Sequence, residues 1–324
     1  MELRPSYELS DGSRLRSGEK SGAPTTHKFR SSDRDNHVRT SRRTSEDWVP
    51  QTGRPTPELE VLIPTCDRPA ELAVTLAGLA AQDRPDFAVH ISDQSSGTAA
   101  DWEHPAIKAM IRVLRVQGRT VTVGRHLPRR GMAEHRAHLL EQASSAQVLF
   151  LDNDVWLEPG SLARLSEAQT TLDCGFVGMA VQGLSHLDDY RPAEEESFQP
   201  WEGPVQPEQI RRSTPAFERW PLHNAANITH IAARLPQDPR GWLPYRVAWV
   251  GGCVLFNRRA LIDSGGFDFW NRLPADHAGE DVAAQWRVME MHGGAGLVPS
   301  GAVHLESPTT VKTRRVDATE ILYP

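Results

Sequence analysis

From residue 59 onward the chain alternates between short apolar runs and segments with helical spacing. The runs that favour strands are 59–63, 87–93, 146–152 and 175–181. Between them, 71–82, 131–143 and 160–170 repeat apolar residues at helical intervals. Strands that alternate with helices predict an α/β fold, with a mostly parallel central sheet flanked by helices on both faces.

The second half of the chain is less regular. Residues 183–246 are rich in Pro and polar groups, and apolar patterning returns at 245–267. A helix is expected at 279–294, followed by a small strand at 295–300. We see no internal repeat.

Composition narrows the class of protein. The chain has 324 residues, 39% of them hydrophobic, which is enough for a sizeable core. Its formal net charge of -6 argues against general nucleic-acid binding. Three separated cysteines argue against a zinc module and suggest a reducing compartment. We find neither a run that would span a membrane nor the apolar core of a signal peptide, so we expect a cytoplasmic protein; peripheral membrane association stays open.

Residues 1–56 differ in composition from the rest. They carry 11 Lys and Arg against 8 Asp and Glu, with few aliphatic residues. Such a segment buries too little apolar surface to offset its ordering entropy, so we interpret it as a disordered tail. It is either a solvated extension or a weak docking segment for anionic lipid or a partner. A single domain is expected over 57–324.

Polar residues follow three of the predicted strands. They are Thr65–Asp67, Asp93 and Asp152–Asp154, and the last group interrupts the run "LFLDNDVWLEP". Ligands of open α/β sheets gather at the carboxyl ends of the strands. Asp-x-Asp at such an end is either a turn or a site for a divalent metal, and its position beside two other polar strand ends favours the metal site.

The ordered motifs identify a family. From about residue 59 to 306 the chain resembles the family 2 glycosyltransferases, which have the GT-A fold. The stretches that resemble family motifs are, in order, "VLIPTCDRP", "ISDQSSG", "GMAEHRAHLL", "LFLDNDVWLEP", "SGGF" and "GEDVAAQWRV". Three positions depart from the family patterns: Cys66 stands where an aromatic residue often stacks on the nucleobase, Gln94 replaces an acid, and Ala137 replaces an Asn. These departures concern the identity of the nucleotide.

The resemblance implies a donor site for a nucleoside-diphosphate sugar, with UDP as the expected nucleotide. Asp93 would hold the nucleobase or ribose, and Arg136 would neutralise phosphate or brace Asp93. A plain salt bridge is the alternative for Arg136. The full implied donor set is Pro64, Thr65, Asp67, Arg68, Asp93, Arg136, Asp152 and Asn153.

The resemblance also implies a divalent cation, Mn²⁺ or Mg²⁺. It would act as a Lewis acid on the leaving diphosphate. Asp152, Asp154 and His304 are the implied ligands, and Glu306 is the rival of His304. A histidine without a metal role is the alternative for His304.

The Gly-Glu-Asp block suggests the catalytic base. Asp281 would take the proton from the acceptor hydroxyl, and Glu280 would contact the acceptor or brace the site. Direct displacement with one base inverts the anomeric configuration. The alternative is that both acids only stabilise the N-terminus of the following helix.

The acceptor side is predicted more coarsely. We assign 57–160 to the nucleotide-sugar half and 161–324 to the acceptor half. Aromatic faces suit sugar rings, and the candidates are Trp249 and Trp270, with Gly252 for close backbone approach. Five of the nine tryptophans fall where the acceptor is expected: Trp201, Trp220, Trp242, Trp249 and Trp270.

Other enzyme classes fit less well. An aspartyl-phosphate phosphatase would have Thr or Val where Trp156 stands, and a dinucleotide-binding protein would have G-x-G-x-x-G after the first strand. We therefore predict an inverting, metal-assisted glycosyltransferase that acts on a hydroxyl of a glycan or related acceptor. A catalytically silent GT-A-like protein that binds sugar nucleotides or scaffolds a partner is the alternative.

Overall fold

The computed structural model describes residues 56–84, 86–309 and 315–324. All of these belong to a single compact unit. Apart from Thr56, the predicted tail 1–56 lies outside the described residues.

An eight-stranded sheet forms the centre of the fold, in the order β3-β2-β1-β4-β9-β6-β11-β8. Neighbouring strands among β3, β2, β1 and β4 are parallel, as are β6 and β11, whereas β9 and β8 run antiparallel to their neighbours. The mostly parallel sheet is thus confirmed. Its strands are β1 (Leu59–Thr65), β2 (Phe87–Asp93), β3 (Thr120–Arg125), β4 (Gln147–Leu151), β6 (Phe176–Gly178), β8 (Leu243–Tyr245), β9 (Cys253–Asn257) and β11 (Gly294–Val298).

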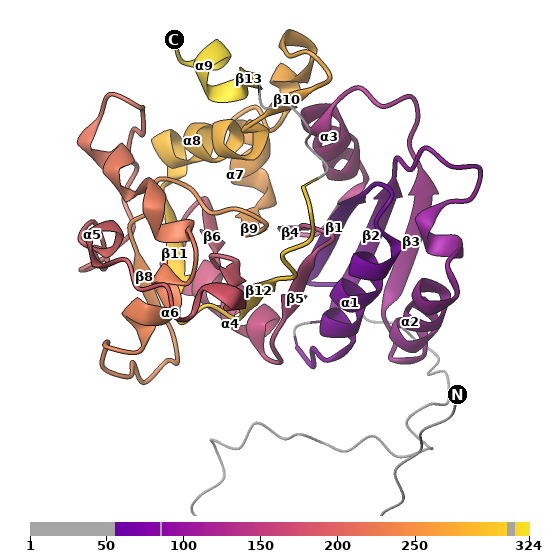
Figure 1. Ribbon diagram of the computed structural model, residues 1–324, viewed down its shortest axis with the longest axis horizontal. Coiled ribbons are helices and arrows are strands. Elements are labelled where there is room, and N and C mark those ends of the chain that lie inside the picture. The colour runs from indigo at the N-terminus through magenta and orange to yellow at the C-terminus, as the bar shows by residue number, and fades with distance from the viewer. Residues whose placement is uncertain (1–55, 85, 310–314) are drawn as a thin grey trace, which may run out of the picture. The chain divides into compact units, whose positions relative to one another are not determined.

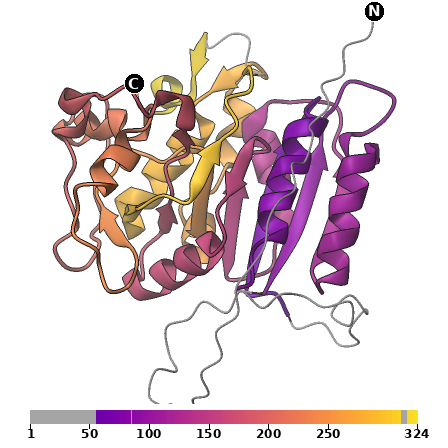
Figure 2. The same cartoon turned by 60° about the horizontal axis from the view of Figure 1, so that its bottom comes forward.

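Helices cover both faces of this sheet. They are α1 (Pro69–Ala80), α2 (Pro105–Val116), α3 (Met132–Gln142), α4 (Ser161–Leu172), α5 (Pro192–Glu195), α6 (Asn227–Ala232), α7 (Arg258–Asp263), α8 (Glu280–His292) and α9 (Ala318–Leu322). Figures 1 and 2 show α1 and α2 beside β1–β3 at one end of the unit, and α5, α6 and β8 at the other.

Alternating side chains of the central strands build two cores. Val61 and Ile63 of β1 pack in one cluster with residues of α1, α2 and α4, whereas Leu62 packs in the other with residues of α3, α7 and α8. Side chains alternate across a strand, so a strand buried on both faces must be apolar at successive positions. This is why successive residues 61–63 are all apolar.

Shorter elements complete the unit. Two small sheets have the orders β5-β12-β7 and β10-β13. Their strands are β5 (Val155–Leu157), β7 (Gln182–Gly183), β10 (His277–Ala278), β12 (Ala302–His304) and β13 (Val316–Asp317). The 3₁₀ helices are η2 (Asp101–Glu103), η3 (Leu184–His186), η4 (Pro215–His223) and η5 (Asp268–Arg272). The irregular region 183–246 contains several of these short elements, as its composition predicts.

One strand was missing from the sequence prediction. The edge strand β3 alternates weakly, with only Val121 fully buried along it, so its pattern does not stand out. Residues 112–116 just before it, which include the apolar Val113, Leu114 and Val116, belong to α2. In the part of the chain that the structure describes, no helix combines the length and apolarity needed to cross a membrane.

The central strand β4 offers a direct test of this packing. Leu149 is fully buried, and Leu149→Ala should lower the free energy of unfolding by about 2–5 kcal/mol because it leaves a cavity. Urea denaturation measures this loss. Val74→Ala on α1, at a side chain that is 40% exposed, is the control and should change stability by less than about 0.5 kcal/mol. An equal effect of both substitutions would contradict the assigned core.

Candidate active site

The carboxyl ends of β1 and β4 separate at the edge of the sheet. The register of β1 with β2 continues to Thr65 opposite Asp93, but its register with β4 stops at Leu62 opposite Phe150. Pro64 lies two residues further on and has no N–H with which to extend a ladder. The candidate donor residue Pro64 therefore lies where the two strands part.

The antiparallel strand β9 begins at this same edge. Just before it, the carbonyl of Gly252 accepts a hydrogen bond of 2.9 Å from the backbone N–H of Asp152. Gly252 has φ +71°, and a Cβ there would lie 3.0 Å from Val181 Cγ1 and 3.5 Å from Asp152 Oδ2. The backbone at Gly252 thus lies close to Asp152, and its approach to a donor sugar stays a prediction.

Arg136 joins α3 to two acids from distant parts of the chain. Its Nη2 donates to Asp152 Oδ1 at 3.0 Å, and its Nε donates to Glu280 Oε1 at 3.1 Å. Arg136 and Glu280 are buried, whereas 37% of the Asp152 side chain is exposed. The guanidinium therefore brings the end of β4 and the start of α8 into one cluster.

Asp281 lies next to this cluster, in the first turn of α8. It lines a cavity of about 10 Å³ together with Arg136, Gly252 and Gln285. Burial, followed by the charge of Glu280, raises the pKa of Asp281 to about 7. A carboxyl group that titrates near neutral pH is suited to proton transfer.

Asp154 meets two basic side chains at one oxygen. Arg68 Nη1 donates to Asp154 Oδ2, and His304 Nε2 lies 3.5 Å from the same atom. Burial alone would raise the pKa of Asp154, but His304 and Arg68 outweigh burial and lower it. The hydrogen bond with Asp154 in turn raises the pKa of His304.

Glu306 is directed away from this pair. Its backbone N–H donates to His304 Nδ1 at 3.0 Å, while its carboxylate accepts from the backbone N–H of Ser185 at 3.1 Å. With Nδ1 accepting, the neutral His304 ring carries its proton on Nε2, toward Asp154. The structure thus places His304, rather than Glu306, against the Asp-x-Asp motif.

The side chains at Asp154 supply part of a ligand set for a hard divalent cation. A carboxylate and an imidazole converge there, and Mn²⁺ accepts both kinds of ligand. No cluster of three His, Cys, Asp or Glu side chains suited to a metal occurs among the described residues. The pair Asp154–His304 would therefore hold a cation only with further oxygen ligands from a substrate, and binding at Nε2 would displace the proton.

The exit from β1 is fixed by a residue that sequence analysis missed. Asp101 Oδ2 accepts from Thr65 Oγ1 at 3.0 Å and from the backbone N–H of Arg68 at 3.1 Å. Asn153 Nδ2 donates to Thr65 Oγ1 at 2.8 Å. Asp101 lies eight residues after the end of β2 and belongs to none of the motifs, so the sequence did not single it out. The one available signal was its position as an acid in the first turn of a short helix.

Asp93 and Asp67 fix the neighbouring loop. Asp93 is fully buried, and its two oxygens accept the backbone N–H groups of Ser95 and Asp101, each at 2.6 Å. Asp67 is more exposed and accepts from the backbone and hydroxyl of Ser96 at 3.0 and 3.1 Å. Asp93 therefore braces the loop after β2 in this structure, and its direct contact with a nucleotide stays a prediction.

The candidate acceptor residues lie in different surroundings. Trp249 is half-buried, three residues before Gly252, and its ring lies near those of His223 and Phe217. Trp270 is in η5, which packs against α3. Trp201 and Trp242 are core residues, whereas Trp220 on η4 is 41% exposed.

Comparison with known proteins gives the class. The sequence model of Glycosyl transferase family 2 matches residues 60–226, just over half of the chain. The chain therefore belongs to glycosyltransferase family 2 and has the GT-A fold. No curated protein matches it significantly.

Solved structures give more distant similarities. Residues 1–349 of TarS from S. aureus have 17% sequence identity and a TM-score of 0.45, with 76% of this chain and 59% of TarS covered. A mannosyltransferase, PcManGT from Pyrobaculum calidifontis, in complex with GDP-Man and Mn²⁺, has 16% identity and a TM-score of 0.46 over 82% of this chain and 60% of that one. The chain thus covers less than two thirds of either structure.

The glycine pair before β9 tests the geometry of this edge. Gly252→Ala should lower the free energy of unfolding by about 1–2 kcal/mol, because alanine is strained at positive φ. Gly251→Ala is the matched control, since a Cβ there meets nothing within 4 Å. Thermal denaturation of both variants measures the difference. A Gly252→Ala protein as stable as Gly251→Ala would contradict the close approach.

Proposed function

We propose that this protein is a glycosyltransferase that inverts the anomeric configuration as it moves a sugar from a nucleoside diphosphate to an acceptor hydroxyl. The convergence of Asp152, Glu280 and Asp281 around Arg136 carries the proposal. It supports a single active site in which Asp281 of α8 accepts a proton and Asp152, just after β4, lies on the side of the phosphates. A UDP-linked sugar is the first donor to test.

The donor would bind at the carboxyl edge of β1, β2 and β4. Thr65, Asp67 and Asn153 line the exits of these strands, and Arg68 and Arg136 are cationic groups that suit phosphate oxygens. Asp152 is available because a third of its side chain is exposed. We propose that Asp152 and Arg136 contact the ribose and diphosphate, with Asp93 holding the loop that borders them.

Charge grows on the diphosphate as the glycosidic bond breaks. Asp154 and His304 would hold Mn²⁺ or Mg²⁺, which when bound supplies Lewis-acid neutralisation of that charge. For such a cation to bind, Arg68 would give up or share its contact with Asp154 Oδ2. His304 and Arg68 can themselves donate hydrogen bonds to the leaving phosphate oxygens.

The acceptor hydroxyl must lose a proton as its oxygen attacks the anomeric carbon. We propose Asp281 as the base, because burial and the charge of Glu280 raise its pKa to about 7. Glu280 is already paired with Arg136, and we assign it to bracing Asp281 and Arg136. One base and one displacement give inversion, which NMR of the product's anomeric proton would report.

The base assignment predicts a loss of transfer without a loss of donor binding. Asp281→Asn should reduce kcat by a factor of at least 10², within the range typical of a missing general base, while the Kd for UDP stays within about threefold. In the wild type, kcat/KM should fall about tenfold per pH unit below pH 7, because the proton then occupies Asp281. Asp263→Asn on α7, at a 38% exposed side chain, is the control. An active Asp281→Asn enzyme would refute the base.

Metal-assisted donor binding is tested by thermal shift. A ligand that binds only the native state, at a concentration of about 100 times its Kd, adds about 2.7 kcal/mol to the free energy of unfolding. UDP with Mn²⁺ should therefore raise the Tm by more than UDP with EDTA. Asp154→Ala should lose this metal-dependent increment and keep the metal-independent part. Equal shifts with Mn²⁺ and EDTA would contradict the metal assignment, and no shift with any nucleoside diphosphate would contradict the donor site.

A further inference from the structure

Three rings form a continuous aromatic surface between η4 and the segment before β9. The ring centroids of Trp220 and His223 lie 6.4 Å apart, and those of His223 and Trp249 lie 4.8 Å apart. Trp220 is 41% exposed, and the other two rings are half-buried. We call these three residues the aromatic platform.

Backbone hydrogen bonds connect the segments that carry Trp249 and His223 with the candidate active site. Trp249 precedes Gly252, whose carbonyl holds the backbone of Asp152. On the other side, the carbonyl of Ala225, two residues after His223, accepts from the backbone N–H of Gly183 at 3.2 Å, and Gly183 pairs with His304 in β7–β12. Trp249 and His223 therefore lie within a few residues of backbone groups that contact the proposed donor site.

The helix that carries Trp220 and His223 is held in place. Arg219 of η4 is buried and donates to both carboxylate oxygens of Glu208, at 2.9 and 2.6 Å. The ring of Phe217 contacts those of Trp249 and Trp286. Fixed rings lose little conformational freedom when a ligand binds, which suits them to recognition.

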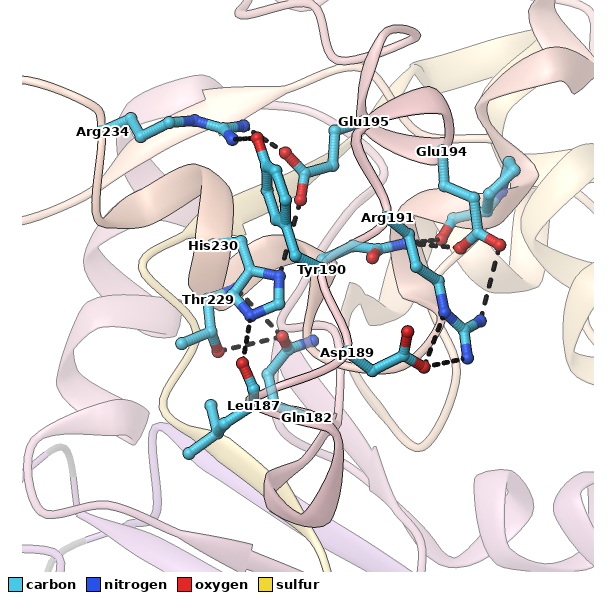
Figure 3. A network of polar contacts seen from close by, with 12 residues as sticks. Gln182, Leu187, Asp189, Tyr190, Arg191, Glu194, Glu195, Thr229, His230 and Arg234 are labelled. Atoms are coloured by element: carbon cyan, nitrogen blue, oxygen red, sulfur yellow. Dashed lines mark hydrogen bonds and ion pairs between the residues drawn. The ribbon is translucent and has the colours of Figure 1, made fainter.

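The adjoining loop supplies polar groups at the border of the platform. Asn227 Nδ2 donates to Glu194 Oε2 at 2.8 Å and to the carbonyl of Pro221 in η4 at 2.9 Å. Figure 3 shows Glu194 held by Arg191, and the neighbouring Glu195 bonded to Arg234, two residues after α6. Glu194 also acts electrostatically on His223. A carboxylate thus stands beside the rings.

The chemistry of the platform distinguishes among acceptor classes. Burial lowers the pKa of His223, so its ring is neutral at pH 7. Neutral aromatic faces next to a carboxylate suit a sugar, whose C–H face packs on rings while its hydroxyls donate to oxygen. The loop 187–196 carries five acids, Asp188, Asp189, Glu194, Glu195 and Glu196. The negative charges of these acids would repel an anionic lipid headgroup.

We propose that the aromatic platform of Trp220, His223 and Trp249 binds a saccharide acceptor, with Glu194 as a hydrogen-bond acceptor for its hydroxyls. The proposal rests on the proposed function, since it names the substrate class for the acceptor side of the same site. It places the exposed residue Trp220, rather than Trp270, with Trp249 at the acceptor.

An oligosaccharide array, probed with the full-length protein in the presence of UDP and Mn²⁺, tests this assignment. Vesicles of phosphatidylglycerol are probed in parallel. We expect binding to one or more oligosaccharides and, for the strongest of them, a Kd that Trp220→Ala raises about tenfold while Trp220→Phe raises it less. Met291→Ala, at a residue of α8 that is 53% exposed, is the control and should leave the Kd unchanged. The Tm of each variant verifies folding.

Three results would overturn the proposal: no oligosaccharide bound by the wild type, the same Kd for Trp220→Ala as for the wild type, or binding to the vesicles alone. The thermal shift with UDP and Mn²⁺ separates these results from a failure of the proposed function. If only the platform is misassigned, that shift persists while the saccharide result is lost.

Discussion

The ion pairs of Arg136 with Asp152 and Glu280 are the contacts on which the site depends. Asp152 and Glu280 are 128 positions apart in the chain, and one guanidinium bonds to both. Without it, Glu280 and Asp281 would be carboxylates buried together near Asp152, and like charges in a buried site oppose ionisation. Arg136 thus permits a base from α8 to lie beside the end of β4. Even with Arg136 present, burial and the charge of Glu280 keep the pKa of Asp281 raised.

Backbone geometry creates the space in which these groups meet. The β1–β4 register ends before Pro64, and β9 enters antiparallel with Gly252 against Asp152. On the base side, β13 pairs with β10 directly before Gly279, and Tyr323 Oη donates to the carbonyl of Ala283 in α8. Regular elements therefore hold both the donor edge and the proposed base, which is the arrangement that positioned catalysis requires.

The periodicity of apolar residues and the short motifs of the sequence predicted the central strands and the candidate acids. Apolar runs such as 61–63 are buried on both faces of the sheet, so their pattern revealed the central strands. Short motifs singled out Asp152 and Asp154, which follow β4, and Asp281, which lies in the first turn of α8; the roles of these residues stay proposals. Three features carried no such signal: β3 is an exposed edge strand, Asp101 acts through hydrogen bonds to a loop, and Trp220 is one of several tryptophans whose exposure only the fold decides.

A double-mutant cycle measures the central contact most directly. Arg136→Met, Glu280→Gln and the double variant are compared with the wild type by urea denaturation at pH 8. We expect a coupling energy of about 1–3 kcal/mol between the two positions, as for a buried, hydrogen-bonded ion pair. The exposed pair Arg259–Asp263, treated in the same way, should give less than about 0.5 kcal/mol. Additive effects at Arg136 and Glu280 would contradict the account.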